Sequence, residues 1–311
     1  MLYTRLVSIK SKQMIIQTQF IKNFIEQNPI LLWFKHKTLR LFHFLDFLIR
    51  KDENENRMAF TTNNPFEDCP EWHELTKVQD AGQIRQGLLV MHNGVKVLPT
   101  AYEGYAHGKL MQRALGIHEP QEERLFRDII HQLPSGSSMM ELGSYWAYYS
   151  LWFQRVISNG ISIMVEPKLS HLNYGKRHFK INNFKGEFLQ AGIGGETSQN
   201  SQFRIVTVDE LFKIYSLKKL TILHSDIQGY ELEMLHGAKD AIKNLAIDFF
   251  FISTHSDTLH QDCLELLTSA NYHILDHYRI RESWNPDGLI VAQSPCIPRI
   301  NLKPSIKISS S

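Results

Sequence analysis

Cysteine is scarce in this chain of 311 residues, which contains only Cys69, Cys263 and Cys296. An odd number of cysteines without paired spacing argues against a disulfide scaffold or a four-cysteine zinc site. It fits a reducing compartment, so we expect a cytoplasmic protein. An excess of one charge is also lacking, because 34 Lys and Arg residues face 32 Asp and Glu residues. The net charge of +2 gives no general attraction to nucleic acid, and we expect no nucleic-acid partner.

Long apolar runs are missing as well. The most apolar segment, residues 30–49, is interrupted by Lys35, His36, Lys37 and Arg40, and the chain has no signal-peptide pattern. With 43% hydrophobic and 21% charged residues, the composition is that of an ordinary globular chain. This excludes collagen, a mostly disordered protein and a multispan membrane protein. The length suits one large α/β domain with an appendage, or two small domains.

The positive charge is concentrated at the N-terminus. Residues 1–51 hold nine basic and two acidic residues, a net charge of +7, whereas the rest of the chain holds 25 basic and 30 acidic residues. Apolar residues at helical spacing, followed by Asn28 and Pro29 as a helix start, predict a basic amphipathic helical extension over residues 1–57.

Three interpretations of this extension remain open. It would lie on an anionic membrane surface and make the protein peripheral to a membrane, with residues 1–51 as the contact. Alternatively, it is a helical hairpin packed on its own body, which we prefer slightly. In the third interpretation, translation begins at Met58, because the segment after residue 51 reads as a polar linker.

Residues 58–118 read as a small irregular region. Asn93 and Gly94 stand between two apolar runs, which is a strong signal for a β-hairpin. The region ends where a helical pattern begins at Glu119, with Pro120 near the helix start.

Short apolar runs then alternate with amphipathic stretches over residues 119–298, and a C-terminal tail follows at 299–311. The predicted strands cover 138–142, 161–165, 186–190, 220–225, 247–253, 272–277 and 289–293. The predicted helices cover 119–133, 148–158, 169–182, 208–215, 231–245 and 259–270. This alternation predicts an α/β fold with a mostly parallel seven-stranded sheet and helices on both faces. A short turn-rich loop precedes the last strand, which we therefore expect to be antiparallel.

Candidate functional residues follow the first two predicted strands. Gly143 comes directly after strand 138–142, where a glycine permits a tight turn and close approach to a ligand. Glu166 and Pro167 end strand 161–165, and a carboxylate at that point can accept both hydroxyls of a ribose. The G-x-G-x-x-G pattern of a pyrophosphate cradle is missing, which counts against a nicotinamide oxidoreductase.

Several motifs together resemble a known family. The segments Glu141-Leu142-Gly143 and Val165-Glu166-Pro167 resemble the first two motifs of class I S-adenosylmethionine-dependent methyltransferases. The segments TVDEL at 207–211, HSDIQGYE at 224–231 and MLHGA at 234–238 resemble the FkbM type of these enzymes. The resemblance covers roughly residues 119–293. It implies a Rossmann-like class I methyltransferase fold and S-adenosyl-L-methionine as the cofactor.

The resemblance also implies a set of cofactor-binding residues at the ends of the strands. These are Glu141 and Gly143 at the methionine end, the backbone of Ser144 and Tyr145 near its carboxylate, Glu166 and Pro167 at the ribose, Ala191 and Gly192 at the adenine, and Asp226 and Gln228 near the methyl group. The chain departs from the family pattern at Ala147, where a second glycine is common, and at His224 and Gln228, which replace the usual Lys and Glu.

Methyl transfer depends mainly on alignment of the nucleophile with the methyl carbon and sulfur. A hydroxyl acceptor also needs a proton acceptor, and Asp226 and His255 are the catalytic candidates. Alternatively, His255 caps the helix that follows it or hydrogen-bonds a loop. A divalent metal on Asp226, Glu231 or Asp257 is conceivable because carboxylates suit Mg²⁺, but the spacing is not diagnostic and no metal site is predicted.

The sequence therefore predicts a methyltransferase that acts on a hydroxyl of a sugar, glycan or secondary metabolite. The alternative is a catalytically inactive binding module with the same fold, which the residues Ala147, His224 and Gln228 favour. Two further residues are interpreted as structural: Asp209 as the cap of helix 208–215, and Cys263 as a core residue.

Overall fold

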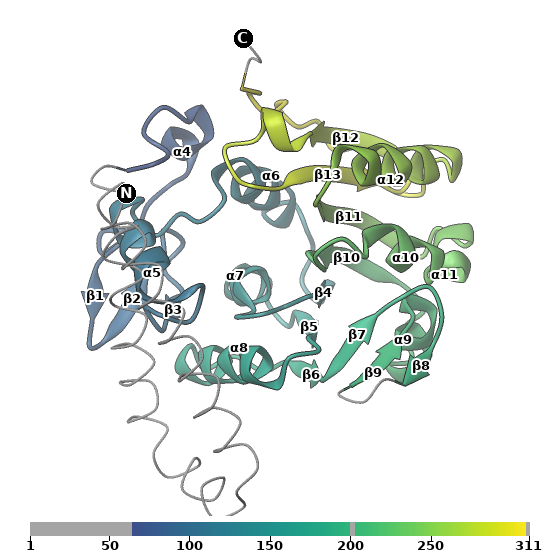
Figure 1. Cartoon of the computed structure of the whole chain (residues 1–311), viewed down its shortest axis with the longest axis horizontal. Coiled ribbons are helices and arrows are strands. Elements are labelled where there is room, and N and C mark those ends of the chain that lie inside the picture. The colour runs from purple at the N-terminus through teal and green to yellow at the C-terminus, as the bar shows by residue number, and fades with distance from the viewer. Residues whose placement is uncertain (1–63, 200–202, 309–311) are drawn as a thin grey trace, which may run out of the picture. The chain divides into compact units, whose positions relative to one another are not determined.

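The computed structural model describes residues 64–199 and 203–308 (Figure 1). The predicted basic extension at 1–57 lies outside these residues. Within the described ranges, no helix combines the length and the apolar character that a membrane span requires.

A seven-stranded sheet forms the centre of the described chain. Its strands are β4 (Ser138–Leu142), β5 (Ile161–Val165), β6 (Glu187–Leu189), β10 (Leu220–Ser225), β11 (Ile247–Thr254), β12 (His273–Tyr278) and β13 (Gly288–Gln293). They lie in the order β12-β13-β11-β10-β4-β5-β6, and only β13 runs antiparallel to its neighbours. The predicted Rossmann-like sheet with an antiparallel C-terminal strand is confirmed. Because the chain order reverses between β4 and β10, their carboxyl ends border the position where ligands bind in such sheets.

Helices cover both faces of this sheet, as predicted (Figure 1). They are α6 (Pro120–Ile130), α7 (Tyr148–Val156), α8 (Leu169–Ile181), α9 (Val208–Ile214), α10 (Glu231–His236), α11 (Lys239–Lys243) and α12 (Asp257–Ser269). Successive strand residues point to opposite faces. Met139 packs into the core beneath α6, α7 and α8, whereas Met140 packs into the core beneath α9 to α12. Burial on both faces explains why the strands read as continuous apolar runs.

Two details of the predicted elements were wrong. The predicted helix 231–245 is divided into α10 and α11, with Gly237 and Ala238 between them. In addition, a three-stranded sheet of β7 (Ala191–Ile193), β8 (Ser198–Gln199) and β9 (Arg204–Val206) follows β6. Strands of two or three residues are too short to produce a period in the sequence.

Asp209 caps a different helix from the one predicted. Thr207 is the N-cap of α9 and accepts a hydrogen bond from the Glu210 backbone N–H. The Asp209 carboxylate instead accepts from the backbone N–H groups of Asp240 and Ala241, at the start of α11. The sequence signal for a cap was correct, but the partner is 31 residues away from Asp209. Cys263 is fully buried, in agreement with its predicted place in the core.

The region before α6 contains the predicted hairpin. Strands β2 (Leu88–Val90) and β3 (Lys96–Val97) pair antiparallel, β1 (Ile84–Arg85) adds a third strand, and α4 (Pro70–Glu74) and α5 (Gly104–Arg113) flank them. His178 of α8 links this region to the loop after β4 by two hydrogen bonds. Its Nε2 accepts from the Leu98 N–H at 3.0 Å, and its Nδ1 donates to the Trp146 carbonyl oxygen at 2.9 Å. Burial lowers the His178 pKa to about 4, so the ring is neutral and can both donate and accept.

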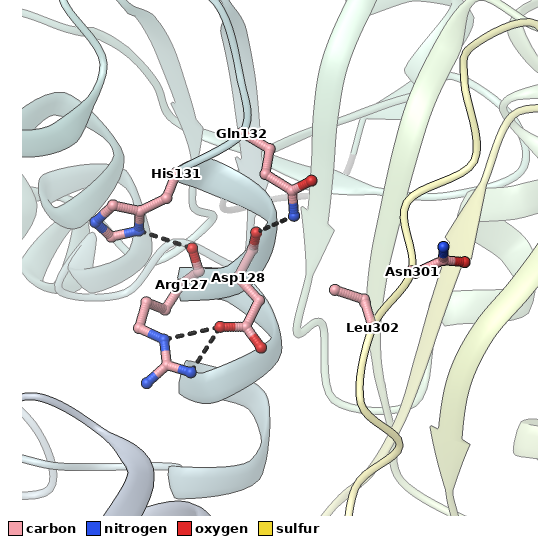
Figure 2. Close-up of a pocket in the computed structure, with 6 residues that line it drawn as sticks. All are labelled: Arg127, Asp128, His131, Gln132, Asn301 and Leu302. Atoms are coloured by element: carbon pink, nitrogen blue, oxygen red, sulfur yellow. Dashed lines mark hydrogen bonds and ion pairs between the residues drawn. The ribbon is translucent and has the colours of Figure 1, made fainter.

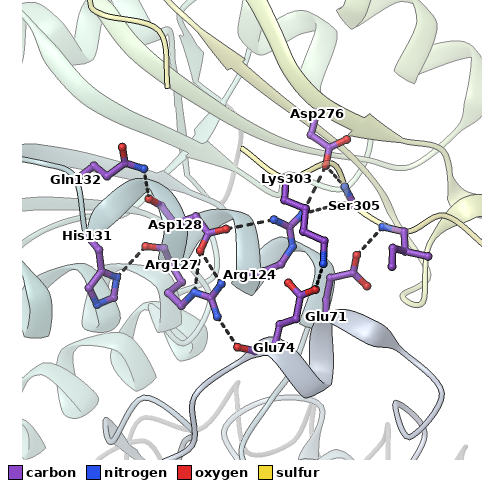
Figure 3. A network of polar contacts seen from close by, with 11 residues as sticks. Glu71, Glu74, Arg124, Arg127, Asp128, His131, Gln132, Asp276, Lys303 and Ser305 are labelled. Carbon is purple, nitrogen blue, oxygen red and sulfur yellow. Dashed lines mark hydrogen bonds and ion pairs between the residues drawn. The ribbon is translucent and has the colours of Figure 1, made fainter. Parts of the chain in front are cut away.

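The C-terminal segment packs on the domain, as Figure 3 shows. The Ser305 backbone N–H donates to Asp276 Oδ2 at 2.7 Å, and its hydroxyl accepts from Arg124 Nη2 at 3.0 Å. The Ile306 N–H donates to Glu71 Oε1 at 2.6 Å. Arg124 is only 1% exposed and also pairs with Asp128 at 3.2 Å. The segment therefore contacts α4 through the Ile306 N–H, whereas Ser305 and the buried Arg124 guanidinium link it to α6 and β12.

Arg124 Nη2 also lies 3.8 Å from the buried Asp276 Oδ2. We expect Arg124→Ala to lower the free energy of unfolding by about 3–5 kcal/mol, because it leaves this carboxylate without its cation. Urea denaturation of the full chain measures this change. Arg85→Ala is the control, since Arg85 pairs with Asp80 on the surface, where solvent screens the charges and the loss should be much smaller. Similar costs for the two variants would contradict the proposed importance of the Arg124 network.

Candidate functional site

The loops after β4 and β10 touch each other through their backbones. The Asp226 N–H donates to the Leu142 carbonyl oxygen at 3.0 Å. Gly143 has a φ of +72°, and a Cβ atom at this position would lie 1.8 Å from the Asp226 carbonyl oxygen. Only glycine permits both this conformation and this approach. The first sequence motif and the FkbM-like signature are therefore in direct contact.

The loop that follows Gly143 contains two further residues with positive φ. Tyr145 has a φ of +41° and Ala147 a φ of +61°, which is costly for residues with a Cβ. Space for the Ala147 methyl group is provided by Gly175 of α8, where a Cβ would lie 3.1 Å from it. Ala147 thus takes the backbone conformation of the expected glycine. The buried Ser144 hydroxyl has no hydrogen-bond partner within the described part of the chain.

Glu166 connects the second motif to this loop. Its Oε2 accepts from the Tyr145 N–H at 3.1 Å, and its Oε1 accepts from the Lys168 N–H at 2.8 Å. Burial raises the pKa of Glu166, although the two backbone N–H groups lower it again in part. Only 5% of Glu166 is exposed.

Pro167 and the start of β7 lie next to Glu166. The Pro167 carbonyl oxygen accepts from Gln190 Nε2 at 3.1 Å, which links the turn after β5 to the residues predicted at the adenine. Ala191 and Gly192 are buried in β7, and a Cβ on Gly192 would lie 2.7 Å from the Phe203 ring.

The second group of predicted residues surrounds His255, which follows β11. His255 Nε2 lies 3.2 Å from Asp226 Oδ1 and 3.5 Å from Asp287 Oδ1, and its Nδ1 lies 3.1 Å from Glu231 Oε1. Burial alone lowers the pKa of His255, but the three carboxylates outweigh it and raise the pKa to about 10. The imidazole is therefore protonated at neutral pH. Ser256 is the N-cap of α12, so His255 does not have the capping role considered as its alternative.

The carboxylates around His255 differ from each other. Burial raises the pKa of Asp226, but His255 and Gln228, whose Nε2 donates to Asp226 Oδ1 at 2.9 Å, lower it below its ordinary value. Burial raises the pKa of Asp287. Glu231 is fully buried, and its Oε1 accepts from the Ile227 and Gly229 N–H groups.

Sequence reasoning missed Asp287, because it lies in a segment that reads only as a turn. The turn precedes β13, and the antiparallel direction of β13 brings its first residues to the carboxyl edge of the sheet. Asp287 therefore faces His255 although the two are 32 residues apart in the sequence.

Glu141 faces the interior of the domain. Its Oε2 accepts from the Ser150 N–H of α7 at 3.0 Å, and only 4% of the residue is exposed. Beside it, His224 Nε2 lies 2.7 Å from Glu122 Oε1 of α6. Burial lowers the pKa of His224 and raises that of Glu122 well above its ordinary value, so this contact joins two neutral groups. Glu122 was also missed, since nothing in a helical segment indicates a partner 102 residues away.

A surface pocket of about 290 Å³ lies elsewhere, between the last turn of α6 and the C-terminal segment. Figure 2 shows the side chains that line it: Arg127, Asp128, His131, Gln132, Asn301 and Leu302. None of the residues predicted from the motifs lines this pocket. No group of three or more His, Cys, Asp or Glu side chains is arranged to hold a metal ion in residues 64–199 and 203–308.

We expect Gly143→Ala to lower the free energy of unfolding by about 2–5 kcal/mol. The new methyl group both occupies a left-handed conformation and collides with the Asp226 carbonyl oxygen. Urea denaturation measures the loss. Gly136→Ala is the matched control, because Gly136 also has a positive φ but a Cβ there meets nothing within 4 Å. An equal loss in both variants would show that strain alone, without the collision, accounts for the cost.

The stabilising contribution of His255 should depend on pH. Its pKa rises from 6.5 to about 10 on folding, so the charged ring stabilises the fold fully below pH 6.5 and loses this contribution as the pH rises through 10. We expect the difference in unfolding free energy between the wild type and His255→Gln to shrink between pH 6.5 and pH 10. The exposed His273 provides the control variant His273→Gln. A difference that stays constant over this range would contradict the assignment.

Comparisons with known proteins agree with the motifs. Residues 140–274 match the model of the methyltransferase FkbM domain, and no match was found among the curated proteins. Three solved structures of methyltransferases resemble the chain. A putative rRNA methylase from Clostridium thermocellum gives 10% identity over 63% of this chain and 99% of that chain, with a TM-score of 0.43. TrmK of M. capricolum in complex with S-adenosylhomocysteine has 12% identity over 55% of this chain and 68% of that chain, with a TM-score of 0.41. A precorrin-6y C5,15-methyltransferase from Geobacter metallireducens has 13% identity over 57% of this chain and 90% of that chain, with a TM-score of 0.41. Residues 140–274 of this chain therefore match the methyltransferase FkbM domain, the family that the sequence motifs indicated.

Proposed function

We propose that the chain transfers a methyl group from S-adenosyl-L-methionine to a hydroxyl oxygen of a sugar, glycan or secondary metabolite. The observation that carries this proposal is the contact between three motifs at one edge of the sheet. Gly143 lies against the Asp226 backbone, and the Tyr145 N–H binds the Glu166 carboxylate. A ribose-binding carboxylate and a proton acceptor therefore border the same loop.

The residues at this edge fit the cofactor. The buried Ser144 hydroxyl lacks a partner among the described residues and is free to bind the cofactor's carboxylate. Each Glu166 oxygen holds one backbone N–H, which leaves lone pairs for the ribose hydroxyls. When bound, S-adenosyl-L-methionine supplies a methyl group already activated by the positive sulfonium.

Asp226 is the proposed proton acceptor for the hydroxyl. His255 is protonated and cannot accept a proton, so we assign it the role of holding Asp226 in place. The lowered pKa of Asp226 makes it a weak base, which suits proton transfer that accompanies formation of the carbon–oxygen bond.

The charges around this edge favour a neutral acceptor. Asp226 acts electrostatically on Glu119, Glu122 and Tyr102, and Asp287 adds a further carboxylate. These carboxyl groups can hydrogen-bond the hydroxyls of a polyhydroxylated molecule, and the ionised Asp226 repels phosphates. This supports a small-molecule or glycan acceptor over a nucleic acid. A cytoplasmic location and a contact of residues 1–51 with a membrane surface stay predictions from the sequence.

The second candidate is a binding module that retains the cofactor site without turnover. The observation in its favour is the protonated His255 beside Gln228, because this arrangement leaves Asp226 as a weak base.

Calorimetric titration of the full chain with S-adenosylhomocysteine, with NAD as the control, tests the proposed function. Micromolar binding of S-adenosylhomocysteine alone is expected, because the strand-end loop lacks the glycines of a pyrophosphate cradle. Absence of binding to either compound, in protein shown to be folded, would overturn the enzyme proposal.

We expect Glu166→Ala to weaken the binding of S-adenosylhomocysteine by about 1.5–3 kcal/mol, the value of hydrogen bonds to a charged group. Asp226→Asn keeps the shape of the side chain and should leave this affinity unchanged, while it lowers turnover. The same titration measures both variants. An equal loss of affinity in both would show that the two roles are wrongly assigned.

A further inference from the structure

The His171 ring lies beside the Glu166 carboxylate and is stacked on the ring of Tyr145. The rings of Tyr145 and His171 are stacked, with their centroids 3.8 Å apart and their planes at 16°. His171 Nδ1 lies 3.7 Å from Glu166 Oε1, and the Tyr145 N–H binds the other oxygen. With these neighbours in place, only 7% of the Glu166 side chain is exposed. A ribose diol that binds this carboxylate must reach oxygens that are almost fully covered.

We propose that the stacked rings of Tyr145 and His171 form a gate over Glu166, and that the cofactor enters when His171 moves away from Tyr145. This inference rests on the proposed function, since it assigns Glu166 to the ribose. It adds His171, a residue of the first turn of α8 that no motif indicated, to the residues that control cofactor binding.

His171 is the mobile half of this gate. Tyr145 is held at both ends, because its N–H binds Glu166 and its hydroxyl accepts from the Glu103 N–H at 3.2 Å. The ring of Tyr102 also lies near that of Tyr145, at 5.4 Å between centroids. By contrast, 23% of the His171 side chain is exposed on the side of solvent, so a change of rotamer can remove it from the stack.

Stacking, rather than an ion pair, holds the gate closed. Burial, together with the charge of Lys168, lowers the pKa of His171 to about 4, so its ring is neutral at pH 7. A neutral imidazole has no ionic attraction to Glu166, and an offset aromatic pair supplies the contact. Opening is therefore expected to be insensitive to salt.

The association rate of S-adenosylhomocysteine with the full chain, measured by stopped-flow fluorescence, tests the gate. His171→Ala removes the stack, and His171→Phe preserves it without the imidazole. Because a protein whose competent state is partly populated binds more slowly and weakly, His171→Ala should associate about two- to tenfold faster, with an unchanged dissociation rate. His171→Phe should associate as the wild type does.

The other outcomes overturn the gate in distinguishable ways. Equal association rates in all three proteins would show that the stack does not limit entry. Faster dissociation from His171→Ala, without faster association, would make His171 a ligand of the bound cofactor instead of a gate. Absence of S-adenosylhomocysteine binding by the folded wild type would overturn the proposed function itself, and the gate with it.

Discussion

Gly143 and Asp226 approach each other so closely that no side chain fits between their backbones, and the geometry of the candidate site depends on this contact. It brings the loop after β4 against the end of β10, where the chain order of the sheet reverses. The turn that begins with the positive φ of Gly143 then places the Tyr145 N–H against Glu166 at the end of β5. Three strand ends are thus tied together before any ligand binds, and backbone atoms provide most of the ties. Gly175 of α8 leaves space for Ala147, which stands where the family pattern commonly has a second glycine.

Carboxyl groups dominate the electrostatics of the site, and they form two groups, one around His255 and one near α6. Near His255, three carboxylates share one positive charge, which keeps the imidazole protonated and lowers the pKa of Asp226. Near α6, burial raises the pKa of Glu122, and burial outweighs the carboxylates of Glu141 and Asp226 to lower the pKa of His224, so both groups favour their neutral forms. The same residue types therefore have opposite protonation preferences because their burial and partners differ. The presence of a histidine after a strand does not by itself make that histidine a base.

The segments outside the matched family domain also contribute to the position of the site. The region before α6 is fastened to the β4 loop through His178, and Glu103 of this region holds the Tyr145 hydroxyl. At the other end, the C-terminal segment joins α4 and β12 to the buried Arg124 of α6. The N-terminal region thus contacts the β4 loop directly, whereas the C-terminal segment contacts α4, α6 and β12.

The sequence by itself determined the order of the strands and helices and the motifs at the strand ends. Burial on both faces gives continuous apolar runs, and glycine or acidic residues stand at the turns. The limits of β4, β5 and β10 and the neighbourhood of Gly143, Glu166 and Asp226 followed from these local patterns. The tertiary structure alone decided which groups meet across long separations: Asp287 with His255, Glu122 with His224, and Asp209 with α11. The physical reason is that a protonation state or a gate depends on burial and on partners from distant segments, and no local period in a sequence records them.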